Sequence, residues 1–106
     1  MFARFLEMTI KPEKKFELTK KMKEEILPML KKYNSFFDVL AFEVENEPTK
    51  FFTISLWNNR VDVEKYEKEF YPKVKAIFEP CLTTAPVVKF CKVDPTITEK
   101  FFAAAA

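Results

Sequence analysis

The stretch FFTISLWNNR, residues 51–60, decides the fold. Side chains of a β-strand alternate between its two faces, and apolar residues occur on both faces of this stretch. The two sets are Phe51, Thr53, Ser55 and Trp57 on one face, and Phe52, Ile54 and Leu56 on the other. Both faces of the strand therefore need a covering layer. Either Asn58 or Asn59 is expected to cap a helix that follows the strand.

Periodic apolar residues on both sides of this stretch predict the other elements. Strands are expected over 1–10, 36–44, 51–57 and 87–93, and helices over 11–34 and from the asparagine pair to about residue 77. Pro28 predicts a kink or break near Leu27, and Pro72 is expected to split the second helix. The apolar stripes of the two helices are Phe16, Met22, Ile26, Met29 or Leu30, and Tyr33, and then Val63, Tyr66, Phe70, Val74 and Ile77.

The order β-α-β-β-α-β predicts an α+β, ferredoxin-like fold, with a four-stranded antiparallel sheet and both helices on one face. The opposite face also carries apolar residues. In the strand over 36–44, alternation places Phe36 on the same face as Leu40 and Phe42. Because two helices shield only one face, the economical cover for the other is a second copy of the chain. We therefore expect a homodimer that packs sheet against sheet.

The composition excludes several classes of protein. The chain has 106 residues, of which 48% are hydrophobic, and we expect a single domain over 1–94 with a tail over 95–106. It has no histidine, which excludes Ser-His and Cys-His nucleophile pairs, HExxH zinc sites and histidine-ligated haem. It has no glycine, which excludes the glycine-rich phosphate loops and the GxSxG elbow. We predict neither a metal site nor a cofactor.

Net charge and the cysteines indicate which kinds of partner and which cellular compartment to expect. The net charge of +2 gives no field strong enough to predict a nucleic-acid or membrane partner. Cys81 and Cys91 form no CxxC pair and are expected to be reduced, packed thiols. Arg4 and Glu7 interrupt the region where a signal peptide would have its apolar core, and no run approaches the length of a membrane span. A cytoplasmic location is therefore expected.

This arrangement resembles the antibiotic biosynthesis monooxygenase (ABM) domain family, the dimeric α+β barrels. The resemblance rests on ISLWNN leading into VEKYEKEFYPKV and on the proline in LPMLKK, and it covers Phe2 to Val93. It implies the ferredoxin-like fold and the homodimer. Members of the family include cofactor-free oxygenases of polyphenols, haem-degrading enzymes and proteins that process signalling molecules.

Two departures from the patterns of this family bear on its chemistry. Haem-degrading members carry a histidine in the second helix and an asparagine in the first strand, whereas this chain has no histidine and places Phe5 at the asparagine position. The resemblance therefore argues against haem degradation. Cofactor-free oxygenases often show Asn-x-x-x-Trp along the third strand. Here Trp57 is kept, and Thr53 replaces the amide.

Cofactor-free oxygenation needs a dry pocket, a base and a donor for the developing oxyanion. The candidate catalytic residues are Trp57 with its indole N–H, Tyr66, and Glu67 as base. Glu7 is an alternative base to Glu67. Either carboxyl could act as base if burial raised its pKa. The candidate substrate-binding residues are Thr53, Ser55 and Phe70.

Each of these residues also has a structural interpretation. Trp57 is a natural packing anchor between strand and helix, Tyr66 fits a core stripe, and Glu67 lies one position off that stripe, where a solvated carboxylate is common. Arg4 and Asp38 stand out because each is a charge within an apolar strand face, and a buried charge needs a partner. They could pair across a dimer, lie at a barrel rim or bind a carboxylate ligand.

The sequence thus leaves two functions open. The first is a cofactor-independent monooxygenase that acts on a small aromatic or enolisable substrate near Trp57. The second is a non-catalytic module on the same fold, which binds a small hydrophobic molecule or serves assembly. An open pocket beside Trp57, Tyr66 and Thr53 would favour the first, and a filled one the second.

Overall fold

The computed structural model describes residues 1–94 and 96. Apart from Thr96, the tail expected over 95–106 lies outside the described residues. The strands are β1 (Phe2–Thr9), β2 (Phe36–Val44), β3 (Glu47–Trp57) and β4 (Val87–Lys92). The helices are α1 (Lys15–Lys21), α2 (Leu27–Leu30), α3 (Arg60–Glu69) and α4 (Tyr71–Phe78). Short helical turns lie at Pro12–Lys14, Met22–Ile26 and Glu79–Cys81.

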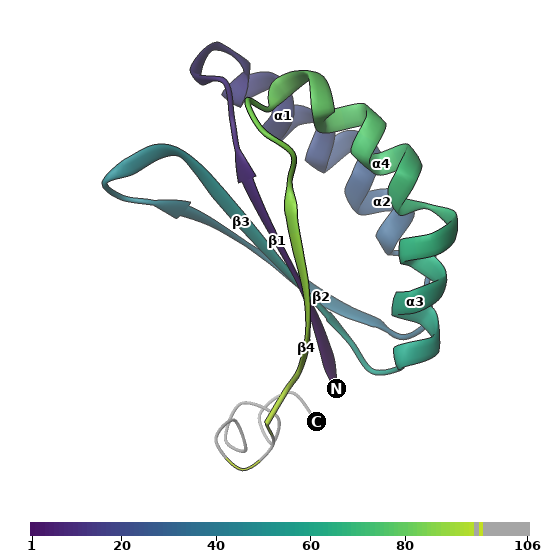
Figure 1. Cartoon of the computed structure of the whole chain (residues 1–106). Helices are drawn as coiled ribbons and strands as arrows, with labels where there is room; N and C mark the ends of the chain where they lie inside the picture. The colour runs from purple at the N-terminus through teal and green to yellow at the C-terminus, as the bar shows by residue number, and fades with distance from the viewer. Residues whose placement is uncertain (95, 97–106) are drawn as a thin grey trace.

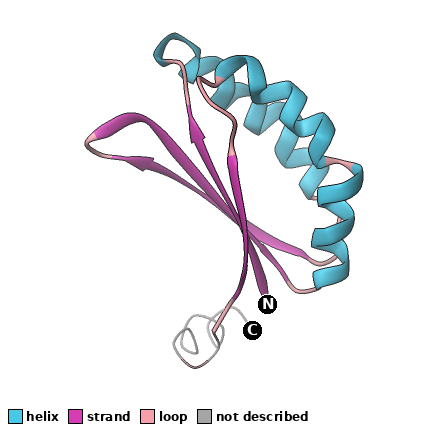
Figure 2. Cartoon of the chain, viewed as in Figure 1, coloured by secondary structure: helices cyan, strands magenta, loops and turns pink. Residues whose placement is uncertain are grey.

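The four strands form one antiparallel sheet in the order β2-β3-β1-β4. Phe5 of the central strand β1 is the register partner of Ile54 in β3 and of Lys89 in β4. All helices lie on one face of this sheet (Figure 1, Figure 2). The predicted ferredoxin-like β-α-β-β-α-β fold is therefore confirmed. The strands over 1–10, 36–44 and 87–93 also match within two residues, whereas β3 begins four residues before the predicted start.

The first helical segment is irregular before its proline. Residues Met22–Ile26 form a π-helical turn between α1 and α2, and Pro28 stands in the first turn of α2. Proline has no N–H to continue the ladder, and it crowds the carbonyl four residues earlier, so a wider turn at this point accommodates it. Helical turns continue through Leu27, so the predicted break is absent, and the irregularity at this point is the π-helical turn.

The second helix is split as predicted. Asn59 caps α3, with its side-chain oxygen accepting a hydrogen bond of 2.7 Å from the N–H of Val61. Helix α3 ends at Glu69 and α4 begins at Tyr71, with Pro72 in its first turn. This break shifts the buried stripe. Tyr71 and Phe78 are buried, whereas the predicted Phe70 and Ile77 are only partly buried.

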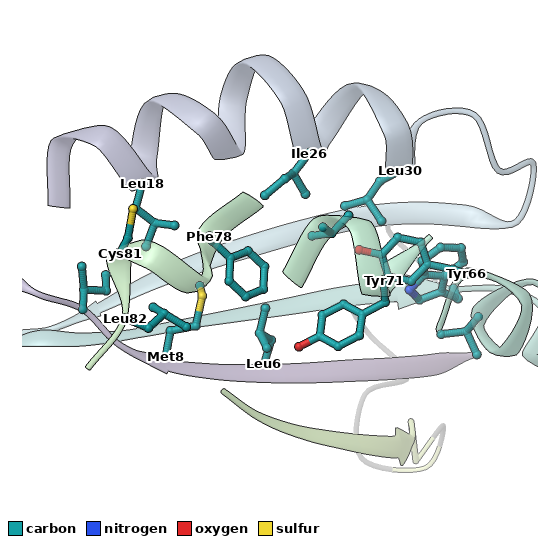
Figure 3. Packing of buried hydrophobic residues seen from close by; sticks show 14 residues of the cluster. Leu6, Met8, Leu18, Ile26, Leu30, Tyr66, Tyr71, Phe78, Cys81 and Leu82 are labelled. Atoms are coloured by element: carbon teal, nitrogen blue, oxygen red, sulfur yellow. The ribbon is translucent and has the colours of Figure 1, made fainter. Parts of the chain in front are cut away.

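The core lies between the helices and the facing side of the sheet. Figure 3 shows Tyr66 and Tyr71 at one end of this cluster and Cys81 and Leu82 at the other. One predicted core residue is wrong, because the side chain of Phe16 is 82% exposed. Leu18, two positions further along the helix, is buried in its place.

A β-bulge corrects the predicted facing of β2. Phe36 and Asp38 pair with the adjacent residues Trp57 and Leu56, which leaves Phe37 as the extra residue. The bulge moves Phe36 to the helix side, where its ring packs against Trp57 at a centroid distance of 5.5 Å. Phe36 therefore does not share a face with Leu40 and Phe42.

The face of the sheet away from the helices is rich in apolar side chains. Leu40 and Phe42 of β2 are each 42% exposed, and the rings of Phe5 and Phe52 pack against each other at 5.4 Å. Register pairing places these residues on one face, because directly opposed residues point to the same side. We call this surface the open sheet face. Within the described part of the chain, no helix has the length and apolar character needed to span a membrane.

Candidate functional site

Trp57 ends β3 and is completely buried. Its indole N–H donates a hydrogen bond of 2.9 Å to the hydroxyl of Ser55. The indole ring packs against Tyr33 at 5.5 Å and Tyr66 at 5.6 Å. The indole N–H, which was expected to donate a hydrogen bond to a ligand, thus has a partner within the chain. Aromatic side chains fill the space around the indole ring.

Ser55 and Thr53 lie on the same face of β3 but have different surroundings. The Ser55 hydroxyl also donates a long hydrogen bond, 3.5 Å, to the carbonyl of Arg4. Thr53 borders a small apolar pocket of about 170 Å³ between β2–β3 and the helical segment that runs from Thr19 to Leu30. The structure therefore does not bring Thr53 and Ser55 together at one open site.

Tyr33 and Tyr66 pack against Trp57, Tyr71 packs against Tyr66, and all three tyrosines are held as neutral phenols. Burial raises the pKa of Tyr66 to about 12, and it also raises the pKa of Tyr33 and of Tyr71. Phe70 packs edge-on against Tyr33 at 5.7 Å. Tyr66 and Phe70 thus belong to an aromatic cluster that packs the core, and none of these phenols serves as a base near neutral pH.

Glu67 pairs with Arg4, the charge on the inner face of β1. Its Oε2 accepts a hydrogen bond of 2.6 Å from Nε of Arg4. The Arg4 side chain is 4% exposed and that of Glu67 29%. The guanidinium lies over the ring of Tyr71 at 4.1 Å and that of Tyr66 at 5.4 Å. Sequence reasoning identified Arg4 as a charge that needs a partner, but it did not predict Glu67 as that partner.

Two buried polar atoms in this neighbourhood lack hydrogen bonds. Neither Nη2 of Arg4 nor the hydroxyl of Tyr71 forms a hydrogen bond of standard geometry with a described residue, although the nearby guanidinium counteracts the rise that burial causes in the pKa of Tyr71. Buried donors are rarely left unpaired, because each loses its bonds to water on burial. The inner face of β1 therefore presents a buried guanidinium that can form further hydrogen bonds.

A pocket of about 440 Å³ opens next to this ion pair. Its lining residues come from the beginning of β1, the end of β4 and helix α3. Figure 1 shows the start of β1 and the end of β4 at the end of the sheet where the N-terminus lies. We call this cavity the α3–β4 pocket. Its walls are Phe2, Ala3, Val63, Phe90 and Cys91, with the charged residues Arg60, Glu64, Glu67, Lys68 and Lys92.

The walls of the α3–β4 pocket combine aromatic surface with charge. Phe90 is 55% exposed and is the register partner of Arg4, so the two side chains lie side by side on the helix face of the sheet. The guanidinium of Arg60 lies over the ring of Phe2 at 5.2 Å. Of the candidate site residues, Glu67 lines this pocket, while Trp57 and Tyr66 are buried in the core. Sequence reasoning did not identify Phe90 as a site residue. The signal available was an aromatic residue in the short last strand.

The remaining candidates lie elsewhere. Glu7 is on the open sheet face, where its carboxylate is 3.5 Å from Nζ of Lys50, so it does not share a site with Glu67. Asp38 is exposed, and its carboxylate accepts a hydrogen bond of 2.7 Å from the N–H of Val39. Both cysteines are free thiols, but Cys91 is exposed, so the expectation of a packed thiol is wrong at that position.

Comparison with known proteins identifies the fold. No family model and no curated protein sequence matches this chain. Among solved structures, a proposed antibiotic biosynthesis monooxygenase from Caulobacter crescentus superposes with a TM-score of 0.76 at 14% identity, covering 88% of this chain and 89% of the other. A conserved protein from Methanosarcina mazei gives a TM-score of 0.74 at 16% identity, covering 89% and 94%. The chain has the fold of the antibiotic biosynthesis monooxygenases.

A third neighbour of this fold was solved with a ligand. It is a monooxygenase from Streptomyces coelicolor in complex with nanaomycin D, with a TM-score of 0.70, 12% identity, and coverage of 88% of this chain and 87% of the other. The ABM resemblance inferred from the sequence is therefore confirmed at the level of the fold. Identities this low leave the chemistry to be argued from the residues of this chain.

Proposed function

We propose that this chain is a homodimeric, small-molecule-binding protein of the ABM fold, with a small aromatic or enolisable molecule as its ligand. The observation that supports this most directly is the α3–β4 pocket, which is of ligand size and has Phe2 and Phe90 on its walls. Exposed aromatic faces favour a flat apolar ligand, while neighbouring charges fix its orientation. Binding without catalysis is favoured because Trp57 and Tyr66, the donors expected for oxygenation, are enclosed in the core.

The proposed homodimer forms through the open sheet face. Leu40, Phe42 and Val87 are large apolar side chains on this face that remain exposed in one copy. A two-fold pairing of identical faces removes them from water without a different partner. Burial of apolar surface contributes roughly 25 cal/mol per Å². An apolar interface of ordinary dimer size therefore contributes substantially to the free energy of association of the two copies.

Cofactor-independent oxygenation is the second candidate, and the position of Glu67 favours it. Its carboxylate lines the pocket and contacts a buried guanidinium. A base and a cation side by side suit a reaction in which a phenol or enol loses a proton and its anion then reacts with oxygen. In this mechanism Glu67 accepts the proton and Arg4 stabilises the resulting oxyanion.

Titration with catechol, hydroquinone and naphthohydroquinone, followed by amide NMR and by oxygen consumption, separates the two candidates. We expect binding that is weakened at least tenfold by Phe90→Ala and unchanged by Phe16→Ala, which trims an exposed ring outside the pocket. Oxygen uptake that Glu67→Gln abolishes would select the oxygenase. Binding without uptake would select the binding protein, and a failure of all three compounds to bind would contradict both.

A further inference from the structure

We infer that the α3–β4 pocket selects aromatic carboxylates, and that Arg4 binds the carboxylate after the side chain of Glu67 turns away. This inference rests on the proposed function, because it names the class of ligand for the same pocket. It is carried by one buried arginine with unused donors, one movable carboxylate and the charge of the surrounding walls.

Arg4 has more donors than its partner uses. A guanidinium presents five N–H donors in a planar fork that matches the two oxygens of a carboxylate. Glu67 engages Nε, while Nη2 is buried and forms no hydrogen bond of standard geometry with a described residue. A ligand carboxylate can bond to two nitrogens of this fork at once, and such paired bonds are among the stronger ones in proteins.

The guanidinium is held in a fixed orientation. It stacks over Tyr71 at 4.1 Å and is flanked by Tyr66 at 5.4 Å. The backbone of Arg4 is fixed by its place in the central strand, between β3 and β4. A donor group that is already in position loses little conformational freedom when a ligand binds.

Glu67 occupies the place that a ligand carboxylate would take. Its side chain is part-exposed, on a helix whose outer surface faces water, so it can move out to solvent at modest cost. Its carboxylate shows that the space beside Nε of Arg4 accepts an anion. In the free protein the carboxylate of Glu67 thus fills the position beside Arg4, and the carboxylate of a bound ligand displaces it.

The charged residues of the pocket favour an anion over a neutral molecule. Lys68 and Lys92 line the walls and form no ion pair with another described residue. With Arg60, the basic side chains of the lining outnumber the carboxylates of Glu64 and Glu67 by three to two. A cleft with this balance attracts and retains anions.

The first test compares benzoate with benzamide, a neutral analogue of the same shape, by calorimetry or NMR titration at low ionic strength. We expect benzoate to bind the intact protein at least tenfold more tightly. Glu67→Gln removes the competing carboxylate and is expected to raise the affinity for benzoate roughly tenfold while leaving that for benzamide within about twofold. Glu64→Gln is the matched control. It removes the same charge from the same helix but frees no donor of Arg4, so its effect should be clearly smaller.

A second measurement requires no change to the buried arginine. The chain contains two arginines, Arg4 and Arg60, so arginine-labelled protein gives two Nε–H signals, which Arg60→Lys assigns. Benzoate is expected to shift the Arg4 signal, and benzamide is not. Benzoate binding that leaves the Arg4 signal unmoved, or equal effects of Glu67→Gln and Glu64→Gln, would overturn the role of Arg4. Equal affinity for acid and amide would overturn the carboxylate preference while the pocket stands. Failure of every aromatic compound to bind would remove the proposed function as well.

Discussion

Nε of Arg4 lies 2.6 Å from Oε2 of Glu67, so a single ion pair joins strand β1 to helix α3 beside the α3–β4 pocket. The pair is asymmetric, because the arginine is buried whereas the glutamate is part-exposed. The cation therefore depends more on the anion than the anion on the cation, since only the anion regains water when the contact breaks.

This asymmetry predicts the stability of Glu67→Ala. Removal of the carboxylate leaves a buried guanidinium with fewer partners, and we expect a loss of about 1–2 kcal/mol in the free energy of unfolding, below the range for a fully buried pair. Urea denaturation measures it. The comparison variant is Glu64→Ala, whose exposed pair with Arg60 spans 3.8 Å and should contribute less than about 0.5 kcal/mol. Similar losses for the two variants would contradict this difference in burial.

The cap of α3 can be tested with two neighbouring asparagines. Asn59→Ala removes the hydrogen bond to the N–H of Val61 and is expected to cost about 1 kcal/mol. Asn58→Ala keeps that bond and should lower the free energy of unfolding by only about a few tenths of a kcal/mol. Thermal unfolding of both variants provides the measurement, and an equal drop for Asn58→Ala would show that the cap does not reside in Asn59 alone.

The open sheet face predicts which substitutions change the oligomeric state. Phe42→Glu places a charge within the apolar surface of that face and is expected to convert the proposed dimer to a monomer, because burial of an unpaired carboxylate is costly. Light scattering after size exclusion measures the mass. Phe16→Glu, on exposed surface of α1, should leave the mass unchanged. A monomeric wild-type protein at micromolar concentration would contradict the dimer outright.

The buried phenols predict loss of stability at alkaline pH. The pKa of Tyr66 is raised from 10.0 to about 12 by burial, and the pKa values of Tyr33 and Tyr71 are also raised. The unfolded chain loses these protons first, so their contribution to stability is fully present below pH 10 and is lost as the pH rises toward about 12. Ultraviolet absorbance of tyrosinate should therefore appear together with unfolding. Tyr66→Phe should weaken this pH dependence. Tyrosinate formation near pH 10 in a protein that stays folded would show the phenols to be accessible.

The elements could be predicted from local signals, because each signal acts within a few residues. Pro72 and Asn59 set the break and the cap of the second helix, and alternation in residues 51–57 set the strand. The bulge at Phe37 could not be predicted, since Phe36 and Phe37 are equally apolar and either can be turned inward. Phe16 was assigned to the core because it is apolar, although Leu18 takes the buried position.

The candidate site was harder to predict because it depends on long-range contacts. Arg4 and Glu67 are 63 residues apart in sequence, and no local pattern connects them. Trp57 and Ser55 were correctly placed on one face, but their mutual hydrogen bond depends on how completely the aromatic cluster fills the space around them. The predicted fold places β4 beside β1, but the pocket wall at Phe90 depends on the register of that pairing, which the periodicity of a short strand does not specify.

The most direct test of the central claim, that the α3–β4 pocket is the ligand site, is amide and methyl NMR mapping of the intact protein as benzoate and hydroquinone are added. We expect the shifts to concentrate at the residues that line this pocket, with Val63, Lys68 and Phe90 among the largest. Shifts centred instead on Thr53 and Leu30, at the small apolar pocket between β2–β3 and the helical segment from Thr19 to Leu30, would contradict it.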